Sequence, residues 1–208
     1  MLRKIGVLCL LVIAGAWGDG VCAQTSGCPG VSACVYNQGC PAASTQVNPG
    51  QSIQAAIIAA APGTTLCVNP GTYPGLIDFL GKPIRLISSG GPTLTILDGG
   101  GAGPVVTFSL AEGRDSILDG FTIRNGQAPY GGGILIQQAS PTIRNCIVSD
   151  NWARGSRTMG GGIGVIRVQS NPSITCTQFL RNRADFYGGG LMSTFSASIC
   201  LPLFHPVG

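Results

Sequence analysis

The sequence is poor in charged residues and in the side chains that most enzymes and metal sites use. Lys, Arg, Asp and Glu together supply 10% of its 208 residues, and it has one histidine, His205, and one glutamate, Glu112. The net charge of +4 is too small to indicate a nucleic-acid partner. Because the chain has neither a Cys-x-x-Cys pair nor a histidine cluster, we expect no metal site. The glycine-rich stretch at 99–103 lacks the flanking elements of a dinucleotide site, so we expect no cofactor.

Long hydrophobic runs are absent after the first twenty or so residues, so we expect no membrane span there. The start of the chain has the pattern of an export signal: Arg3 and Lys4, an apolar stretch at 5–17 and small residues at 21–23. We therefore expect a signal peptide at 1–23, whose removal lowers the net charge from +4 to +3. The mature protein is then secreted, extracellular or on the cell surface, which means the periplasm or outer membrane in a Gram-negative bacterium.

Cysteine usage fits export. Seven cysteines follow the signal segment: Cys28, Cys34, Cys40, Cys67, Cys146, Cys176 and Cys200. The even spacing of the first three, followed by Cys67, predicts that an irregular Cys-rich leader at 24–46 is joined by disulfides to the first strand region, with the pairing left open. One of the seven must remain unpaired or bond to another chain. A lipid anchor on Cys22 is an alternative that the bulky Val21 disfavours.

Glycine, by contrast, supplies 33 positions, which suits short strands and tight turns better than helices. The convincing helix signal lies at 52–60, where Ser52 can cap the first turn and Ile53 and Ile57 share a face. A Pro-Gly pair at 62–63 ends it. Short β-type runs separated by turn residues follow at 65–68, 76–79, 84–88, 94–97 and 105–109.

From residue 116 the chain repeats itself. The repeated segments are SILDGFTIRN at 116–125, SPTIRNCIVSDN at 140–151 and NPSITCTQFLRN at 171–182. In each, an isoleucine precedes an asparagine by eight residues, as in Ile117 and Asn125, Ile143 and Asn151, and Ile174 and Asn182. The intervals between successive isoleucines are 26 and 31 residues. Strand-and-turn repeats of this length are typical of a solenoid.

In a solenoid, equivalent residues of successive coils stack about 4.8 Å apart. We therefore expect Val148 and Phe179 to lie in the interior, together with one row that contains Ile117, Ile143 and Ile174. Three glycines in a row precede each following strand, at 131–133, 160–162 and 188–190. Such triplets allow backbone angles and close approaches that a Cβ forbids, so each is predicted to form a corner.

Polar residues also fall into columns. The asparagines are expected to form a structural ladder in which side-chain amides bond along the stack, and its members are Asn125, Asn151 and Asn182. The residues before them place a carboxylate between two guanidinium groups, namely Arg124, Asp150 and Arg181. Opposite charges on neighbouring strands are favourable, so this pattern supports the stacking.

The segment SIQAAIIAAAPGTTLCVNPGTYPGLIDFLGKPIRLISSGGPTLTILDGG at 52–100 resembles the N-terminal cap and first coils of the pectate-lyase-like, right-handed parallel β-helix family. The pairing of a glycine triplet with FLRN is also similar to the repeats of polymorphic outer-membrane proteins. Together these resemblances cover about residues 47–200. They imply an all-β fold, a right-handed, single-stranded parallel β-helix solenoid at 47–208 with an N-terminal capping helix.

The resemblance does not assign a function, because this fold hosts lyases, hydrolases, esterases and adhesins alike. The paired aspartates and the Gly-His-Gly segment of polygalacturonase-like members are missing. Asp115, Asp119 and Arg144 are the nearest set to the acidic calcium ligands and the basic group of a lyase. Arg114, Asp115 and Asp119 could form a catalytic or metal cluster, but Asp119 falls at a turn position of the repeat. We therefore expect no catalytic residue.

The loops between the asparagines and the glycine triplets carry aromatic and basic side chains. Tyr130, Met159 and Tyr187 align directly before the triplets. On a solenoid these loops gather along one edge, where they form an aromatic and basic strip suited to sugar rings and uronate carboxylates. The alternative is that the tyrosines and Phe186 only cover the corner. The predicted polysaccharide-binding residues are Tyr130, Trp152, Arg154, Arg157, Arg183 and Tyr187.

The sequence thus predicts an exported scaffold that binds polysaccharide or a cell surface without catalysis. The alternatives are a polysaccharide lyase or glycoside hydrolase fragment acting on acidic glycans, and an inert remnant of a truncated gene. A further repeat begins at 196–204 and breaks off without a capping segment. We therefore expect a C-terminally truncated chain whose last coil favours self-association.

Overall fold

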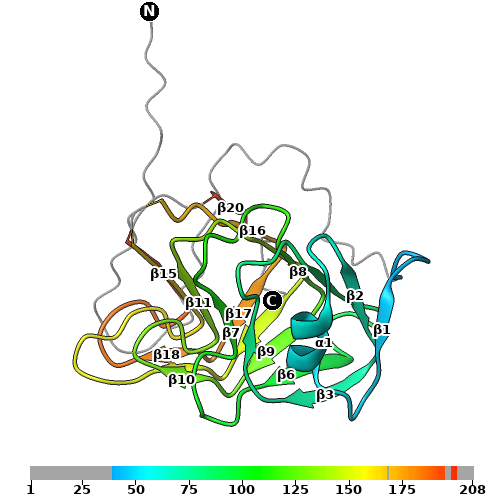
Figure 1. Cartoon of the computed structure of the whole chain (residues 1–208). Helices are drawn as coiled ribbons and strands as arrows, with labels where there is room; N and C mark the ends of the chain where they lie inside the picture. The colour runs from blue at the N-terminus through cyan, green and yellow to red at the C-terminus, as the bar shows by residue number, and fades with distance from the viewer. Residues whose placement is uncertain (1–38, 168, 195–197, 201–208) are drawn as a thin grey trace, which may run out of the picture.

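A computed structural model of the chain describes residues 39–167, 169–194 and 198–200. Within these residues the chain forms an all-β parallel solenoid with one short helix, α1 (Figure 1). The expected signal peptide, most of the Cys-rich leader and the final segment with His205 lie outside the described residues. No helix in the described part of the chain has the length and apolar character needed to cross a membrane.

The strands form four sheets that run along the solenoid, and every pairing between them is parallel. The seven-stranded sheet has the order β1 (Thr45–Val47), β2 (Thr65–Val68), β5 (Arg85–Ser88), β8 (Ile117–Asp119), β12 (Thr142–Arg144), β16 (Ser173–Thr175) and β20 (Ser198–Cys200). One five-stranded sheet has the order β17 (Gln178–Leu180), β13 (Ile147–Ser149), β9 (Thr122–Arg124), β6 (Thr95–Asp98) and β3 (Gly71–Pro74). The other has the order β19 (Leu191–Ser193), β15 (Ile163–Ile166), β11 (Ile134–Gln137), β7 (Val106–Phe108) and β4 (Ile77–Asp78). The three-stranded sheet contains β10 (Gln127–Ala128), β14 (Trp152–Ala153) and β18 (Arg183–Ala184).

The repeats stack as expected, but the first of them is shifted by one residue. Leu118, Ile143 and Ile174 are register partners in successive coils, and all three are fully buried. Ile117 instead pairs with Thr142 and is only half-buried, so its expected place in the interior row is wrong. Matching isoleucine to isoleucine placed this strand one residue out of register. A shift of one residue moves a strand's side chains to the opposite face, so Leu118 and not Ile117 points inward.

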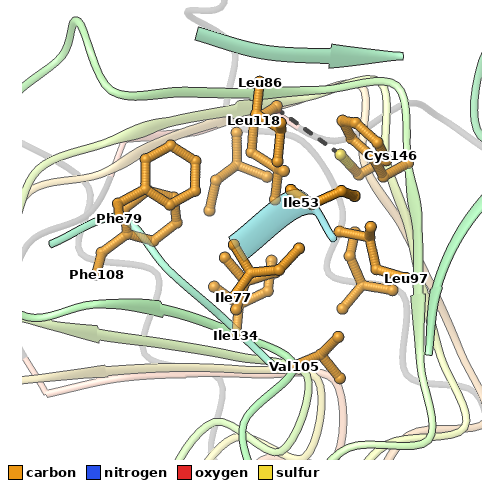
Figure 2. Close-up of a cluster of buried hydrophobic side chains, with 14 of the residues drawn as sticks. Ile53, Ile77, Phe79, Leu86, Leu97, Val105, Phe108, Leu118, Ile134 and Cys146 are labelled. Atoms are coloured by element: carbon orange, nitrogen blue, oxygen red, sulfur yellow. Dashed lines mark hydrogen bonds between the residues drawn. The ribbon is translucent and has the colours of Figure 1, made fainter. Parts of the chain in front are cut away.

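The core runs along the inside of the coil and receives side chains from the surrounding sheets. In Figure 2, Ile134, Leu118 and Leu97 point inward from three different sheets. The expected interior positions Val148 and Phe179 are register partners; Val148 is buried, and Phe179 packs against the core. An interior closed by sheets in this way buries apolar surface within every coil, which supplies most of the driving force for folding.

The helix α1 (Ile53–Ala59) packs against the N-terminal end of this core. Ser52 caps its first turn, as predicted, and Ile53 and Ile57 are buried in the core. At its other end the Lys82 ammonium donates to three main-chain carbonyls, which complements the helix dipole. These are the carbonyls of Ile57, Ile58 and Ala60, at 2.9, 2.7 and 3.0 Å.

In the described part of the chain β1 is the first strand, and it pairs with β2. A disulfide between Cys40 and Cys67 joins the chain ahead of β1 to β2, which confirms that the leader is bonded to the first strand region. Cys146 is a free cysteine and is buried. Burial raises the pKa of its thiol to about 12, so the reactive thiolate is not populated at neutral pH.

The asparagines do not all behave alike. The Asn151 amide donates to the Asn182 amide oxygen at 3.0 Å, and the Asn182 amide donates to a main-chain carbonyl of the coil below. The same register places Gly126, and not Asn125, beside Asn151, because β10 and β14 pair through Gln127 and Trp152. Asn125 lies outside the ladder and donates to the Asp98 carboxylate at 3.0 Å. Its expected place in the ladder is therefore corrected by the one-residue shift.

The glycine triplets form corners, as expected. Gly160 has a φ angle of +67°, in the left-handed region that glycine tolerates. A Cβ on Gly161 would overlap with the carbonyl oxygens of Arg183 and Gly189 in the next coil. The main-chain N–H groups of one triplet donate to carbonyls of the next, so the corners stack without side chains between them.

Candidate functional site

The three-stranded sheet of β10, β14 and β18 supports most of the predicted strip. β10 and β18 lie together at one corner of the coil, and long loops extend outward beside them (Figure 1). The outward column of this sheet contains Gln127, Trp152 and Arg183, and the adjoining column contains the small residues Ala128, Ala153 and Ala184. The sequence indicated loops here, because strands of two residues are too short to give an alternating pattern.

Trp152 lies at the centre of this sheet and collects two basic side chains. The guanidinium carbon of Arg183 lies 4.6 Å from the centroid of the Trp152 ring, and that of Arg154 lies 4.7 Å from it. Arg183 is the register partner of Trp152 in the next coil, whereas Arg154 follows two residues later in the same coil. Each contact has the geometry of a cation–π interaction, worth about 0.5–1 kcal/mol at an exposed site.

Asp185 is a member of this cluster that the sequence did not indicate. One carboxylate oxygen accepts from the Trp152 indole N–H at 2.8 Å, and the other accepts from the Gly155 main-chain N–H at 3.1 Å. The same carboxylate lies 3.7 Å from the Arg183 guanidinium. The hydrogen bond from Trp152, followed by that from Gly155, lowers the pKa of Asp185. One signal was present in the sequence, because aligning Asn151 with Asn182 also places Asp185 opposite Arg154.

The aromatic part of the strip is a second column in the loops. Tyr130 and Met159 form an isolated parallel bridge, and so do Met159 and Tyr187, as their alignment before the triplets predicted. Phe186 and Tyr187 contact each other edge to face, with ring centroids 4.9 Å apart. Their exposed fractions are 60% and 46%, so both rings are accessible to a ligand.

The strip has a surplus of positive charge. Arg154, Arg157 and Arg183 are all exposed, and Asp185 is the carboxylate that contacts this group. Arg157 lies in the loop after β14, whereas the other two arginines contact the Trp152 ring. Such an arrangement favours anionic ligands, because guanidinium groups bind carboxylate and phosphate groups through paired hydrogen bonds.

Two acidic residues outside the strip, Asp119 and Glu112, hold coils together. Asp119 accepts from the Arg144 guanidinium at 2.7 Å and from the Asn145 amide at 2.8 Å. These bonds join neighbouring coils. They are consistent with a structural role for Asp119 at a turn of the repeat, which was the alternative to a catalytic or metal cluster. Glu112 is buried, and its carboxylate accepts from two main-chain N–H groups. Among the described residues no group of three His, Cys, Asp or Glu side chains is placed to hold a metal ion.

The ion pairs between coils predict a loss of stability in acid. Hydrogen bonds from Arg181 lower the pKa of Asp150. Partial burial tends to raise the pKa of Asp98, but hydrogen bonds from Asn125 and Arg124 outweigh it and lower that pKa. A lowered pKa contributes stability that is complete above the unfolded-state value, near pH 4, and is lost as the pH falls through the folded-state value. We expect each pair to contribute about 1 kcal/mol or less, because its members are partly exposed.

Urea unfolding between pH 6 and pH 2.5 measures this loss. The urea concentration at the wild-type unfolding midpoint is expected to decrease once the pH is below about 4. Asp150→Asn is expected to make this decrease smaller. A midpoint that is independent of pH over this range would show that the carboxylates contribute nothing to folding.

No family model, curated protein or solved structure matches this chain. Its function is therefore inferred from the arrangement of its own residues.

Proposed function

We propose that the protein is an exported, non-catalytic β-helix scaffold that binds a polysaccharide at a cell surface. The observation that carries this proposal is the strip beside β10, β14 and β18, which combines exposed aromatic rings with clustered guanidinium groups. Aromatic rings stack on the apolar faces of sugars, and guanidinium groups pair with their carboxylates. A rigid solenoid holds these groups at a spacing set by the coils, which favours an extended ligand.

A scaffold fits the strip better than an enzyme does. Polysaccharide lyases and hydrolases use acidic side chains that are free to act as bases, acids or metal ligands. Asp185 is the carboxylate bonded within the strip, and both of its oxygens are engaged, with Trp152 and Gly155. Because both oxygens already accept hydrogen bonds, a positioning role is favoured for Asp185 over a catalytic one.

Binding of polygalacturonate to the purified full chain tests the proposal by isothermal titration calorimetry. Tyr187→Ala is expected to weaken binding at least about tenfold, because it removes an exposed ring of the aromatic column that also contacts Phe186. Trp152→Ala is expected to weaken it similarly, because two arginines contact this ring. Leu94→Ala serves as a control, since it removes an exposed apolar side chain outside the strip.

Two results would contradict the proposal. Release of unsaturated or reducing-end products from polygalacturonate or alginate would identify an enzyme. Equal affinities of the wild type and both strip variants would place the binding site elsewhere on the molecule.

A further inference from the structure

We propose that Asp185 is a positioning residue that fixes the orientation of the Trp152 ring, on which two arginines stack. In this arrangement Trp152 orients guanidinium groups, and the sugar-stacking surface is formed by Phe186 and Tyr187. This inference rests on the proposed function and assigns separate roles in ligand binding to the residues of the strip. It changes the role of Trp152, which the sequence indicated as a ring for stacking sugars.

The contacts of the Trp152 ring carry the first step. Two guanidinium carbons lie within 5 Å of its centroid, from Arg154 in the same coil and Arg183 in the next. A ring in contact with two guanidinium groups presents less free surface to a sugar than the exposed rings of Phe186 and Tyr187 do. A guanidinium group stacked on an aromatic ring keeps its N–H groups available at the edge, where they can bind an anion.

The bonds of Asp185 carry the second step. Its two oxygens accept from the Trp152 indole and from the Gly155 main chain, so one carboxylate links β14, the loop after it and the next coil. The indole N–H fixes the orientation of the ring, and the Gly155 bond fixes the start of the loop that carries Arg157. Immobilising these groups before a ligand arrives reduces the entropy lost on binding.

The sign of the effect on affinity distinguishes positioning from charge. Asp185 lies 3.7 Å from the Arg183 guanidinium and lowers the positive potential of the strip. If only charge mattered, Asp185→Asn would tighten the binding of an anionic ligand. If positioning dominates, the same substitution weakens binding. One carboxylate oxygen is replaced by an amide nitrogen, which cannot accept a hydrogen bond, so the two N–H groups must share one acceptor oxygen.

The test uses the fluorescence of Trp152 in the full chain. The sequence has two tryptophans, and Trp17 lies in the expected signal peptide, so Trp17→Phe leaves Trp152 as the single reporter even where that segment is retained. In that background Asp185→Asn is expected to increase quenching of the emission by acrylamide, because its single acceptor oxygen must serve both the indole and the Gly155 N–H and so holds the ring less often. Asp150→Asn is the matched control, since it removes an exposed aspartate paired with Arg181 that has no bond to the indole.

Affinity for polygalacturonate is then measured for the same variants. Asp185→Asn is expected to weaken binding by up to about tenfold, the effect of mobilising one or two side chains, while Asp150→Asn leaves it unchanged. Unfolding curves confirm that both variants are folded. Arg183→Lys provides a second test that does not alter Asp185: it is expected to weaken binding, because an ammonium group lacks the planar fork of a guanidinium.

The possible failures are distinct. Unchanged quenching in Asp185→Asn, or tighter binding of polygalacturonate, would overturn the positioning role while the proposed function stands. A wild-type protein that binds no polysaccharide would overturn the proposed function, and quenching in the unliganded protein would still decide whether Asp185 holds the ring.

Discussion

Replacing Gly161 with alanine is expected to lower the free energy of unfolding by more than about 4 kcal/mol, the range reached by severe steric substitutions. The added Cβ would overlap with the carbonyl oxygens of Arg183 and Gly189, which belong to the main chain of the next coil. Main-chain atoms in a stacked corner cannot move aside as a flexible side chain can, so the coils must separate. The hydrogen bonds that join successive glycine triplets would then be lost along with the corner.

Urea unfolding followed by circular dichroism, together with the yield of soluble protein, measures this effect. Gly113→Ala is the matched control, because a Cβ there meets no atom within 4 Å and Gly113 has no positive φ angle. It is expected to be neutral or stabilising by about 0.4–1 kcal/mol, since alanine restricts the unfolded chain. Similar stabilities of the two variants would mean that the corners tolerate a looser stack than the structure has.

Phe108→Ala is expected to cost about 3–5 kcal/mol, because it removes a large side chain from a closed interior. Phe108 is fully buried, and its ring centroid lies 4.3 Å from that of Phe79 in the preceding coil (Figure 2). Phe108 also pairs in register with Ile136 of the following coil. The vacated space therefore borders two coils, and rigid sheets on its sides limit how far it can collapse.

Two substitutions give this prediction its scale. Phe108→Leu keeps most of the volume and is expected to cost clearly less than the alanine variant. Leu110→Ala, two residues further on, removes a side chain that is 59% exposed and is expected to change stability by no more than about 0.5 kcal/mol. Thermal or urea unfolding compares all three, and equal losses for Phe108→Ala and Leu110→Ala would show that the site is not part of the core.

Local signals in the sequence located the secondary structure well. The helix was predicted with its cap at Ser52, and the strand at 65–68 agrees with β2. These signals are local because a capping side chain and an apolar face depend on residues a few positions apart. The parallel solenoid was equally accessible, since repeats with a shared pattern place matching residues in columns.

Register was harder to obtain from the sequence. Ile117 and Leu118 are both able to fill an interior position, and only the pairing between coils decides which of them faces inward. Aligning identical letters chose Ile117, and the same shift placed Asn125 in the ladder where the structure has Gly126. Chemical similarity alone does not resolve such a shift.

The strip was predicted in part. The contact of Trp152 with Arg183 follows from the stacking of successive coils, which the repeats indicate, whereas Arg154 lies two residues after Trp152 in the same coil. Asp185 was overlooked because an aspartate in a glycine-rich loop has the appearance of an ordinary turn residue. Its bond to an indole in another coil depends on a side-chain direction that the spacing of residues does not specify.

Three ion pairs that join coils in the described part of the chain have the same polarity. Asp98 binds Arg124, Asp119 binds Arg144 and Asp150 binds Arg181, so the acidic partner always belongs to the earlier coil and the basic partner to the later one. Each of these earlier coils therefore presents a carboxylate to an arginine of the coil that follows it. A chain synthesised from its N-terminus can build on the α1 end and add coils one at a time, and we expect opposite charges to attract each new segment to the edge of the coils already formed.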